Sequence, residues 1–334
     1  MSTAAAWRKD VRRLFASSPI AGPLATLIIV FTLFSLFVPH FFTLRTVSGI
    51  LNASTLVGMV TIGVTLLMIS GEFDLSVGAL PAMGGFLYAL NTMNGGSPVV
   101  ALLLAILVPA ALGALNGLIL IRTRIPSFIT TLGTRSIYRG AAWVLSGGMM
   151  AQTLEKLPIY NVFNGRLDVV NDLFAGANFR TAALWLFLVA VICQYVLVRT
   201  RYGNHVFAAG GNPGAAQAQG VNVNRVKVIN FMISGALAGF SGVLLFSQFK
   251  TVRVATGAGM ELSAIAAAVV GGASLTGGYG SIWGALIGVL LISTLRTGVV
   301  LLYIPFIPAD NFPAVVGVTI VAAVILNNWL RSRS

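Results

Sequence analysis

Long apolar runs, separated by short polar stretches, repeat along almost the whole chain. A helix needs about 20 apolar residues to cross the roughly 30 Å hydrocarbon core of a membrane. The chain therefore reads as an all-α polytopic membrane protein, with residues 1–334 forming one transmembrane domain. The pattern predicts ten membrane-spanning helices, at residues 20–38, 47–70, 74–92, 98–121, 126–147, 181–199, 227–248, 258–275, 280–302 and 312–330.

Composition supports this reading and argues against a soluble enzyme. Hydrophobic residues make up 57% of the chain and charged residues only 9%, too few to cover a water-exposed surface. The glycine-rich stretches lack the G-x-x-x-x-G-K-[ST] spacing that cradles phosphates, and His40 and His205 fall on opposite sides of the predicted membrane. We expect no catalytic site, metal site or cofactor in this chain, and the lone Cys193 has no intrachain disulfide partner.

Lysine and arginine gather on one side of the predicted membrane. Cytoplasmic segments of membrane proteins carry an excess of these residues, so the net charge of +13 is read as a topology signal and not as a sign of nucleic-acid binding. With both termini cytoplasmic, residues 1–19 and 200–226 lie inside and the long loop 149–180 lies outside. Twelve of the 21 basic residues then fall inside: Arg8, Lys9, Arg12, Arg13, Arg122, Arg124, Arg199, Arg201, Arg225, Lys227, Arg331 and Arg333.

The two halves of the chain have related layouts. Segments 47–147 and 227–330 each hold four predicted helices, spans 2–5 and 7–10, and each carries a glycine-rich break after its early spans. Because five spans separate equivalent helices, these helices run in opposite directions. The layout predicts an inverted repeat, which is typical of transporters.

Two carboxylates, Glu72 and Asp74, interrupt about forty apolar residues in the stretch ISGEFDLSVGAL, residues 69–80. An ionised aspartate at a helix centre in a membrane costs about 2.5–3.5 kcal/mol, so its presence needs a reason. One interpretation is that Asp74 caps a helix by accepting hydrogen bonds from the amides of Ser76 and Val77. The other is that the break lies beside a path for a polar solute. The two interpretations are compatible.

The segment 200–226 is too polar to cross the membrane, yet PGAAQAQG predicts one short helix between Pro213 and Gly220. A free helix of two turns is marginal in water, so we expect it to dock against something. It is either a plain connector or a rod that transmits motion from a cytoplasmic partner.

Four motifs stand out along the chain: GEFDLSVGAL at 71–80, NGLILIRTRIPSFITTLGTRSIYRG at 116–140, AAGGNPGAAQAQGVNVNRVKVINFMISGALAGFSGVLL at 208–245 and AAVVGGASLTGGYGSIWGALIGVLLISTLRTGVVLL at 267–302. Together they resemble the permease subunits of ribose-type bacterial sugar ABC importers. The resemblance runs from about residue 45 to 330 in the family's order. Most members of the family have GGIDLSVG where this chain has Glu72 and Phe73 in GEFDLSVG. The difference affects either the choice of substrate or only the local packing.

The resemblance implies a type II ABC importer in the bacterial inner membrane. Such an importer has two permeases, either two copies of one chain or a chain and a paralogue, two cytoplasmic ATPase domains that bind ATP and Mg, and a periplasmic solute-binding protein. The outer loop 149–180 would help receive the binding protein, with Glu155, Lys156, Arg166 and Asp168 suited to a polar contact. The segment 200–226 would be the coupling loop, whose ATPase-docking surface consists of Gly210, Gly211, Asn212, Ala215, Ala216, Gly220 and Val221.

A sugar on its path needs hydroxyl and amide partners and an aromatic face. The candidates near the predicted breaks are Asn52, Thr55, Glu72, Phe73, Asp74, Ser76, Thr131 and Ser274. Arg135, Arg139 and Arg296 lie within predicted spans, where they either pair with acids or line the path.

The expected function is thus that of a permease for a monosaccharide of the pentose or hexose type. A second hypothesis is a proton-coupled secondary transporter in which Glu72 or Asp74 takes up the proton. A third keeps the ABC assembly but changes the cargo to a nucleoside, a polyol, an autoinducer sugar or a branched-chain amino acid.

Overall fold

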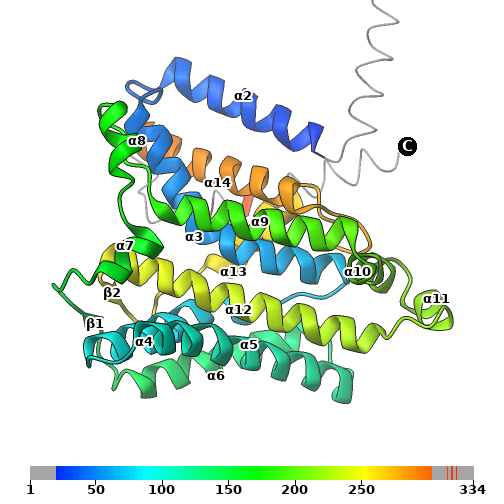
Figure 1. The fold of residues 1–334 in the computed structure, drawn as a ribbon. Helices are drawn as coiled ribbons and strands as arrows, with labels where there is room; N and C mark the ends of the chain where they lie inside the picture. The colour runs from blue at the N-terminus through cyan, green and yellow to red at the C-terminus, as the bar shows by residue number, and fades with distance from the viewer. Residues whose placement is uncertain (1–19, 303–313, 315–316, 319–320, 322–334) are drawn as a thin grey trace, which may run out of the picture.

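The computed structural model describes residues 20–302, 314, 317–318 and 321 as a bundle of helices that lie side by side (Figure 1). The predicted cytoplasmic segment 1–19 and nearly all of the tenth predicted span, 312–330, lie outside the described residues. The elements are α2 (Ala21–Phe37), α3 (Leu44–Ile69), the 3-10 turn η1 (Ser76–Gly78), α4 (Leu80–Met93), α5 (Pro98–Thr123), α6 (Ser127–Leu145), β1 (Ala151–Gln152), α7 (Pro158–Asn164), α8 (Asp168–Leu173), α9 (Thr181–Arg199), α10 (Arg201–Gly211), α11 (Pro213–Ala218), α12 (Val223–Phe249), β2 (Thr251–Val252), α13 (Met260–Val270) and α14 (Ile282–Leu302).

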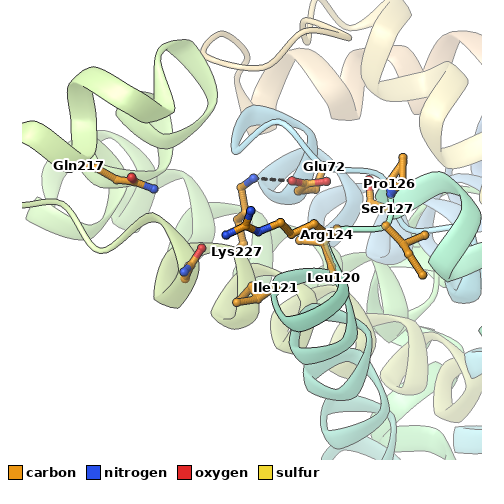
Figure 2. A pocket seen from close by; sticks show the side chains of 10 residues that line it. Glu72, Leu120, Ile121, Arg124, Pro126, Ser127, Gln217 and Lys227 are labelled. Atoms are coloured by element: carbon orange, nitrogen blue, oxygen red, sulfur yellow. Dashed lines mark hydrogen bonds and ion pairs between the residues drawn. The ribbon is translucent and has the colours of Figure 1, made fainter.

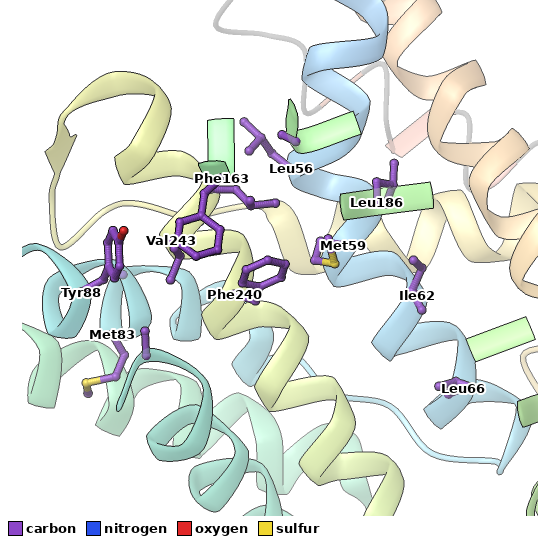
Figure 3. Close-up of a cluster of buried hydrophobic side chains, with 14 of the residues drawn as sticks. Leu56, Met59, Ile62, Leu66, Met83, Tyr88, Phe163, Leu186, Phe240 and Val243 are labelled. Atoms are coloured by element: carbon purple, nitrogen blue, oxygen red, sulfur yellow. The ribbon is translucent and has the colours of Figure 1, made fainter. Parts of the chain in front are cut away.

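Helices α3 and α12 form the centre of the bundle. In their most apolar stretches 83% and 61% of residues are buried, against 28% in α5 and 22% in α9. Leu56, Met59 and Ile62 on α3 and Phe240 and Val243 on α12 belong to one buried apolar cluster (Figure 3). Of these four apolar helices, α3 and α12 therefore lie in the core of the bundle, and α5 and α9 lie at its outside.

Each central helix is followed by an interruption and a short helix. The 26-residue α3 leads through residues 70–79 to the 14-residue α4, and the 27-residue α12 leads through residues 250–259 to the 11-residue α13. The predicted spans 74–92 and 258–275 are therefore shorter helices than the sequence pattern suggested. Helix α5 packs on α12, and α14 packs on α3.

Among the described residues, five helices are long and apolar enough to cross a membrane: α3, α5, α9, α12 and α14. Helices α2 and α13 are apolar but shorter. Helix α6, which covers the predicted span 126–147, has 19 residues but carries two arginines and several hydroxyl side chains, so its composition differs from that of a lipid-facing span.

The two ends of the bundle carry different structures (Figure 1). At one end lie α10 and α11, and α11 confirms the short helix expected between Pro213 and Gly220. Helix α10 was expected as loop; it forms because Thr200 caps the amide of Gly203 and because Val206 and Ala209 are fully buried. At the other end, β1 pairs antiparallel with β2, close to α7, and α8 also lies at this end.

Helices α5 and α12 approach each other closely at Gly113. A methyl group on Gly113 would overlap the backbone carbonyl of Phe231 on α12. Small residues at such crossings let helix backbones pack within a membrane, where the hydrophobic effect gives little drive for helices to associate.

We predict that Gly113→Ala lowers the free energy of unfolding by about 1–3 kcal/mol, because the carbonyl of Phe231 has to move. The measurement is thermal unfolding of the purified chain in detergent. The matched control is Gly49→Ala on α3, where nothing lies within 4 Å of the added carbon, and which should leave stability unchanged or slightly raised. Equal effects of the two substitutions would contradict the close approach.

Candidate functional site

The chain unwinds between α3 and α4, around the two carboxylates. Helix α3 ends at Ile69, and Gly71 adopts φ +86°, a left-handed conformation that favours glycine. Residues 70–75 form no regular helix, and only the short turn η1 precedes α4. Backbone polar groups in such a stretch need partners from side chains if the segment lies at membrane depth.

Helix α6 supplies those partners from one side of its surface. Side chains four residues apart lie on the same side of a helix, one turn above another. Four polar residues follow this spacing along α6: Ser127, Thr131, Arg135 and Arg139. We call them the α6 ladder.

Three members of the α6 ladder bind the backbone of the unwound segment. The Ser127 hydroxyl accepts a hydrogen bond from the amide of Phe73 at 3.1 Å, and the Thr131 hydroxyl accepts one from Leu75 at 3.0 Å. The Arg139 Nη2 donates to the Gly78 carbonyl at 2.7 Å. The polar side of α6 thus replaces hydrogen bonds that a continuous helix would make internally.

The fourth member, Arg135, reaches across to the other interrupted helix. Its Nη2 lies 2.6 Å from a carboxylate oxygen of Glu261 in the first turn of α13. Glu261 is only 1% exposed, and its second oxygen lies so close to Gly78 that a methyl group there would overlap it. The ion pair therefore joins α6, α13 and η1 at one point.

Asp74 is fully buried and caps the 3-10 turn. Its Oδ1 accepts hydrogen bonds from the Ser76 amide at 2.9 Å and the Ser76 hydroxyl at 2.6 Å, and the amide of Val77 also bonds the carboxylate. Its Oδ2 accepts from the Ser234 hydroxyl on α12 at 3.1 Å. The bond from the Ser76 amide that the sequence predicted is confirmed, although Asp74 lies one residue before Leu75, the N-cap position of η1. The contact with α12 is an addition to the predicted role.

The cap extends into a buried network between α5 and α6. The Asn116 amide donates to the Ser76 hydroxyl at 2.8 Å, and the Tyr138 hydroxyl donates to Asn116 Oδ1 at 2.8 Å. The sequence patterns did not indicate four of these site residues: Asn116, Tyr138, Ser234 and Glu261. The available signal was the one that identified Asp74, a lone polar side chain inside or beside an apolar run.

Glu72 lies at the edge of a polar pocket of about 500 Å³ and forms an ion pair with Lys227 of α12 (Figure 2). The pocket is bounded by the unwound segment, the turn between α5 and α6, α11 and the start of α12. Its lining residues are Glu72, Leu120, Ile121, Arg124, Ile125, Pro126, Ser127, Gln217, Asn224 and Lys227. Lys227, for which the charge pattern indicated only a topological role, is thus part of the site.

Helix α10 is fixed to the same region through its last residues. Gly210 is buried, and a methyl group on it would overlap the carbonyl of Ile69, the last residue of α3. The Gly278 amide donates to that carbonyl at 2.8 Å. The end of α10, the end of α3 and the glycine-rich turn 271–281 therefore meet through their backbones.

The seven residues expected to dock an ATPase differ in exposure. Gly210 and Ala216 are buried within the chain, and Val221 is half-buried. The remaining four are exposed on the surface: Gly211, Asn212, Ala215 and Gly220. Asn212 caps α11 by accepting a hydrogen bond from the Ala215 amide at 3.0 Å.

The eight candidate path residues do not form one site. Glu72, Phe73, Asp74, Ser76 and Thr131 come together at the unwound segment, as described above. Asn52 and Thr55 lie near the other end of α3, where Asn52 donates to the Asn178 carbonyl at 2.7 Å and Thr55 bonds its own helix. Ser274 lies in the turn 271–281, 2.9 Å from the Thr276 hydroxyl.

At the opposite end of the bundle, Lys250 contacts α7, which lies in the loop 149–180. The Lys250 ammonium lies 4.1 Å from the centre of the Tyr160 ring on α7 and donates to the Ser247 carbonyl. Burial, followed by the charge of Arg180, lowers the pKa of Lys250 to about 8. Deprotonation of Lys250 would remove the positive charge over the ring.

We predict that Asp74→Asn keeps most of the folded protein and that Asp74→Leu loses it. The asparagine oxygen still accepts the Ser76 amide, whereas leucine leaves buried donors from Ser76 and Ser234 unpaired, at about 1–3 kcal/mol each. The measurement is the yield of monodisperse protein in detergent. Normal yield for Asp74→Leu would show that the cap is dispensable.

The chain is an apolar helix bundle whose unwound segment is held by side chains and lies beside a polar pocket. This architecture is typical of membrane transport proteins. The family described as "Branched-chain amino acid transport system / permease component" matches residues 46–324, and the chain belongs to it. The chain is therefore a multi-pass transport permease, as its resemblance to import permeases indicated.

Relatives of known function cover most of the chain. It is 34% identical to the ribose import permease protein of Bacillus subtilis over 92% of both chains. It is 32% identical to the L-arabinose ABC transporter permease protein of Azospirillum brasilense, over 85% of this chain and 81% of the relative. It is 29% identical to the autoinducer 2 import system permease protein of Photorhabdus luminescens, over 92% of this chain and 89% of the relative. No solved structure matches the chain.

Proposed function

We propose that this chain is the membrane-spanning permease of an ATP-driven, binding-protein-dependent importer of a monosaccharide, and that two permeases form the path. The observation that carries the proposal is the direct backbone contact between the end of α10, which leads into α11, and the end of α3, where the chain unwinds. A force on α11 thereby reaches the unwound segment without an intermediate layer of side chains.

The coupling is proposed to begin at α11. The exposed Ala215 and Gly211 offer small side chains to a cytoplasmic ATPase, while the buried Ala216 anchors α11 to the rest of the chain. Gln217 of α11 lines the pocket that also contains Glu72, so a shift of α11 changes the pocket's shape (Figure 2). ATP and Mg would be bound by the ATPase.

Ten spans and an inverted repeat remain part of the proposal. In its favour, the series of long helix, interruption, short helix and long helix occurs twice, as α3, α4 and α5 and again as α12, α13 and α14. The crossed packing of α5 on α12 and α14 on α3 is the arrangement a two-fold relation produces. Both termini are placed in the cytoplasm of a bacterium, and the loop 149–180 in the periplasm, facing the binding protein.

The proton-coupled alternative has less support. Both carboxylates already have structural partners: Glu72 forms an ion pair with Lys227, and Asp74 accepts hydrogen bonds from Ser76 and Ser234. A monosaccharide is preferred over a nucleoside, polyol or branched-chain amino acid because the ribose and arabinose permeases are among the relatives. An autoinducer sugar fits the third relative.

The test is uptake of labelled ribose, arabinose, galactose and autoinducer 2 into vesicles that contain this chain, its neighbouring-gene ATPase and the binding protein. We expect uptake of one of these sugars to require both internal ATP and the binding protein. Uptake driven by a proton gradient without ATP would overturn the proposal.

We predict that Ala215→Arg abolishes most of this uptake while leaving the amount of folded permease unchanged, because the side chain is exposed on the proposed docking surface. The control at the same position is Ala215→Ser, which should transport normally. Ala216→Arg should instead reduce folded protein, since Ala216 is only 5% exposed. Full uptake by Ala215→Arg would remove α11 from the docking surface.

A further inference from the structure

Arg135 lies halfway along α6 and is incompletely covered. Its side chain is 30% exposed although its Nη2 contacts the buried Glu261. Helix α6 lies beside α5, one of the five helices apolar enough to cross a membrane (Figure 1). A guanidinium exposed at this depth to lipid tails would cost about 2.5–3.5 kcal/mol or more.

Arg135 cannot escape this cost by reaching the membrane surface. Helix α6 has 19 residues, so its midpoint is about 14 Å from either end at 1.5 Å per residue. That distance is about twice the reach of an arginine side chain, and the ion pair with Glu261 holds the guanidinium inward. The exposed edge of Arg135 must therefore meet water or a polar group.

We propose that Arg135, held by Glu261, lines a water-filled path on the exposed side of α6, where its free N–H groups face the hydroxyl oxygens of a passing polyhydroxyl solute. Guanidinium carries five N–H donors, and the contact with Glu261 occupies one Nη atom. Glu261 is the positioning residue, because it fixes the orientation of the Arg135 guanidinium and offsets the guanidinium's positive charge. The solute class rests on the proposed function, whereas the water-filled path does not.

Helix geometry supplies a reporter and a control at similar depth. Ser136 is exposed and lies three residues before Arg139, so it is a neighbour of Arg139 on the α6 surface. Ile137 is 66% exposed and points to the opposite side of α6 from Arg135 and Arg139. Ser136 should border the path, and Ile137 should face away from it.

The experiment is thiol labelling of the full chain, expressed with its partner subunits in native membranes. In a Cys193→Ser background, Ser136→Cys and Ile137→Cys are each treated with anionic and cationic membrane-impermeant thiosulfonates, with and without ATP. We expect Ser136→Cys to be modified in at least one of these conditions, with the anionic reagent favoured, and Ile137→Cys to stay unmodified. Replacing Arg135 by Gln should reduce the anionic preference by about threefold or more.

Modification of Ser136→Cys no faster than that of Ile137→Cys in both conditions would overturn the proposal. So would an anionic preference that Arg135→Gln leaves unchanged. Neither result depends on which solute is carried, so labelling can fail while sugar uptake succeeds. Conversely, labelling as expected without ATP-dependent uptake of any sugar would count against the proposed function alone.

Discussion

The structure depends on pairing the backbone polar groups of one unwound segment. Residues 70–79 leave α3 without continuing as helix, and a membrane interior offers no water to bond their amides and carbonyls. The α6 ladder supplies acceptors for Phe73 and Leu75 and a donor for Gly78, while Asp74 caps the turn that follows. This requirement explains why α6 is more polar than its neighbours and why a buried aspartate is retained.

The same pairing connects parts of the chain that are distant in sequence. Ser234 on α12 donates a hydrogen bond to Asp74, and Glu261 on α13 forms an ion pair with Arg135 of the α6 ladder. Lys227, near the start of α12, forms an ion pair with Glu72. The unwound segment is thus held from both halves of the chain, and at its α3 end it touches the end of α10. A segment with bonds to so many elements responds when any of them moves, as a transporter that alternates between two open states requires.

Local patterns predicted much of this and missed the rest for physical reasons. An acid two residues before Ser76 is a local capping signal, so the role of Asp74 could be read from the sequence, as could α11 between a proline and a glycine. The Arg135 and Glu261 contact joins distant elements and has no local signature. The lengths of α4 and α13 were overestimated because apolar residues in the interruptions look like helix, although their backbones are not helical. Five of the ten predicted spans correspond to membrane-length helices among the described residues: α3, α5, α9, α12 and α14.

The most direct test of this account is amide hydrogen exchange of residues 71–80 in the purified chain, compared between the natural sequence and Thr131→Val. Valine keeps the shape of the side chain but cannot accept the Leu75 amide. The account predicts that exchange in this segment becomes about fivefold faster, the factor for one hydrogen bond worth about 1 kcal/mol, while exchange in α9 stays the same. Unchanged exchange in residues 71–80 would contradict the claim that α6 holds the unwound segment.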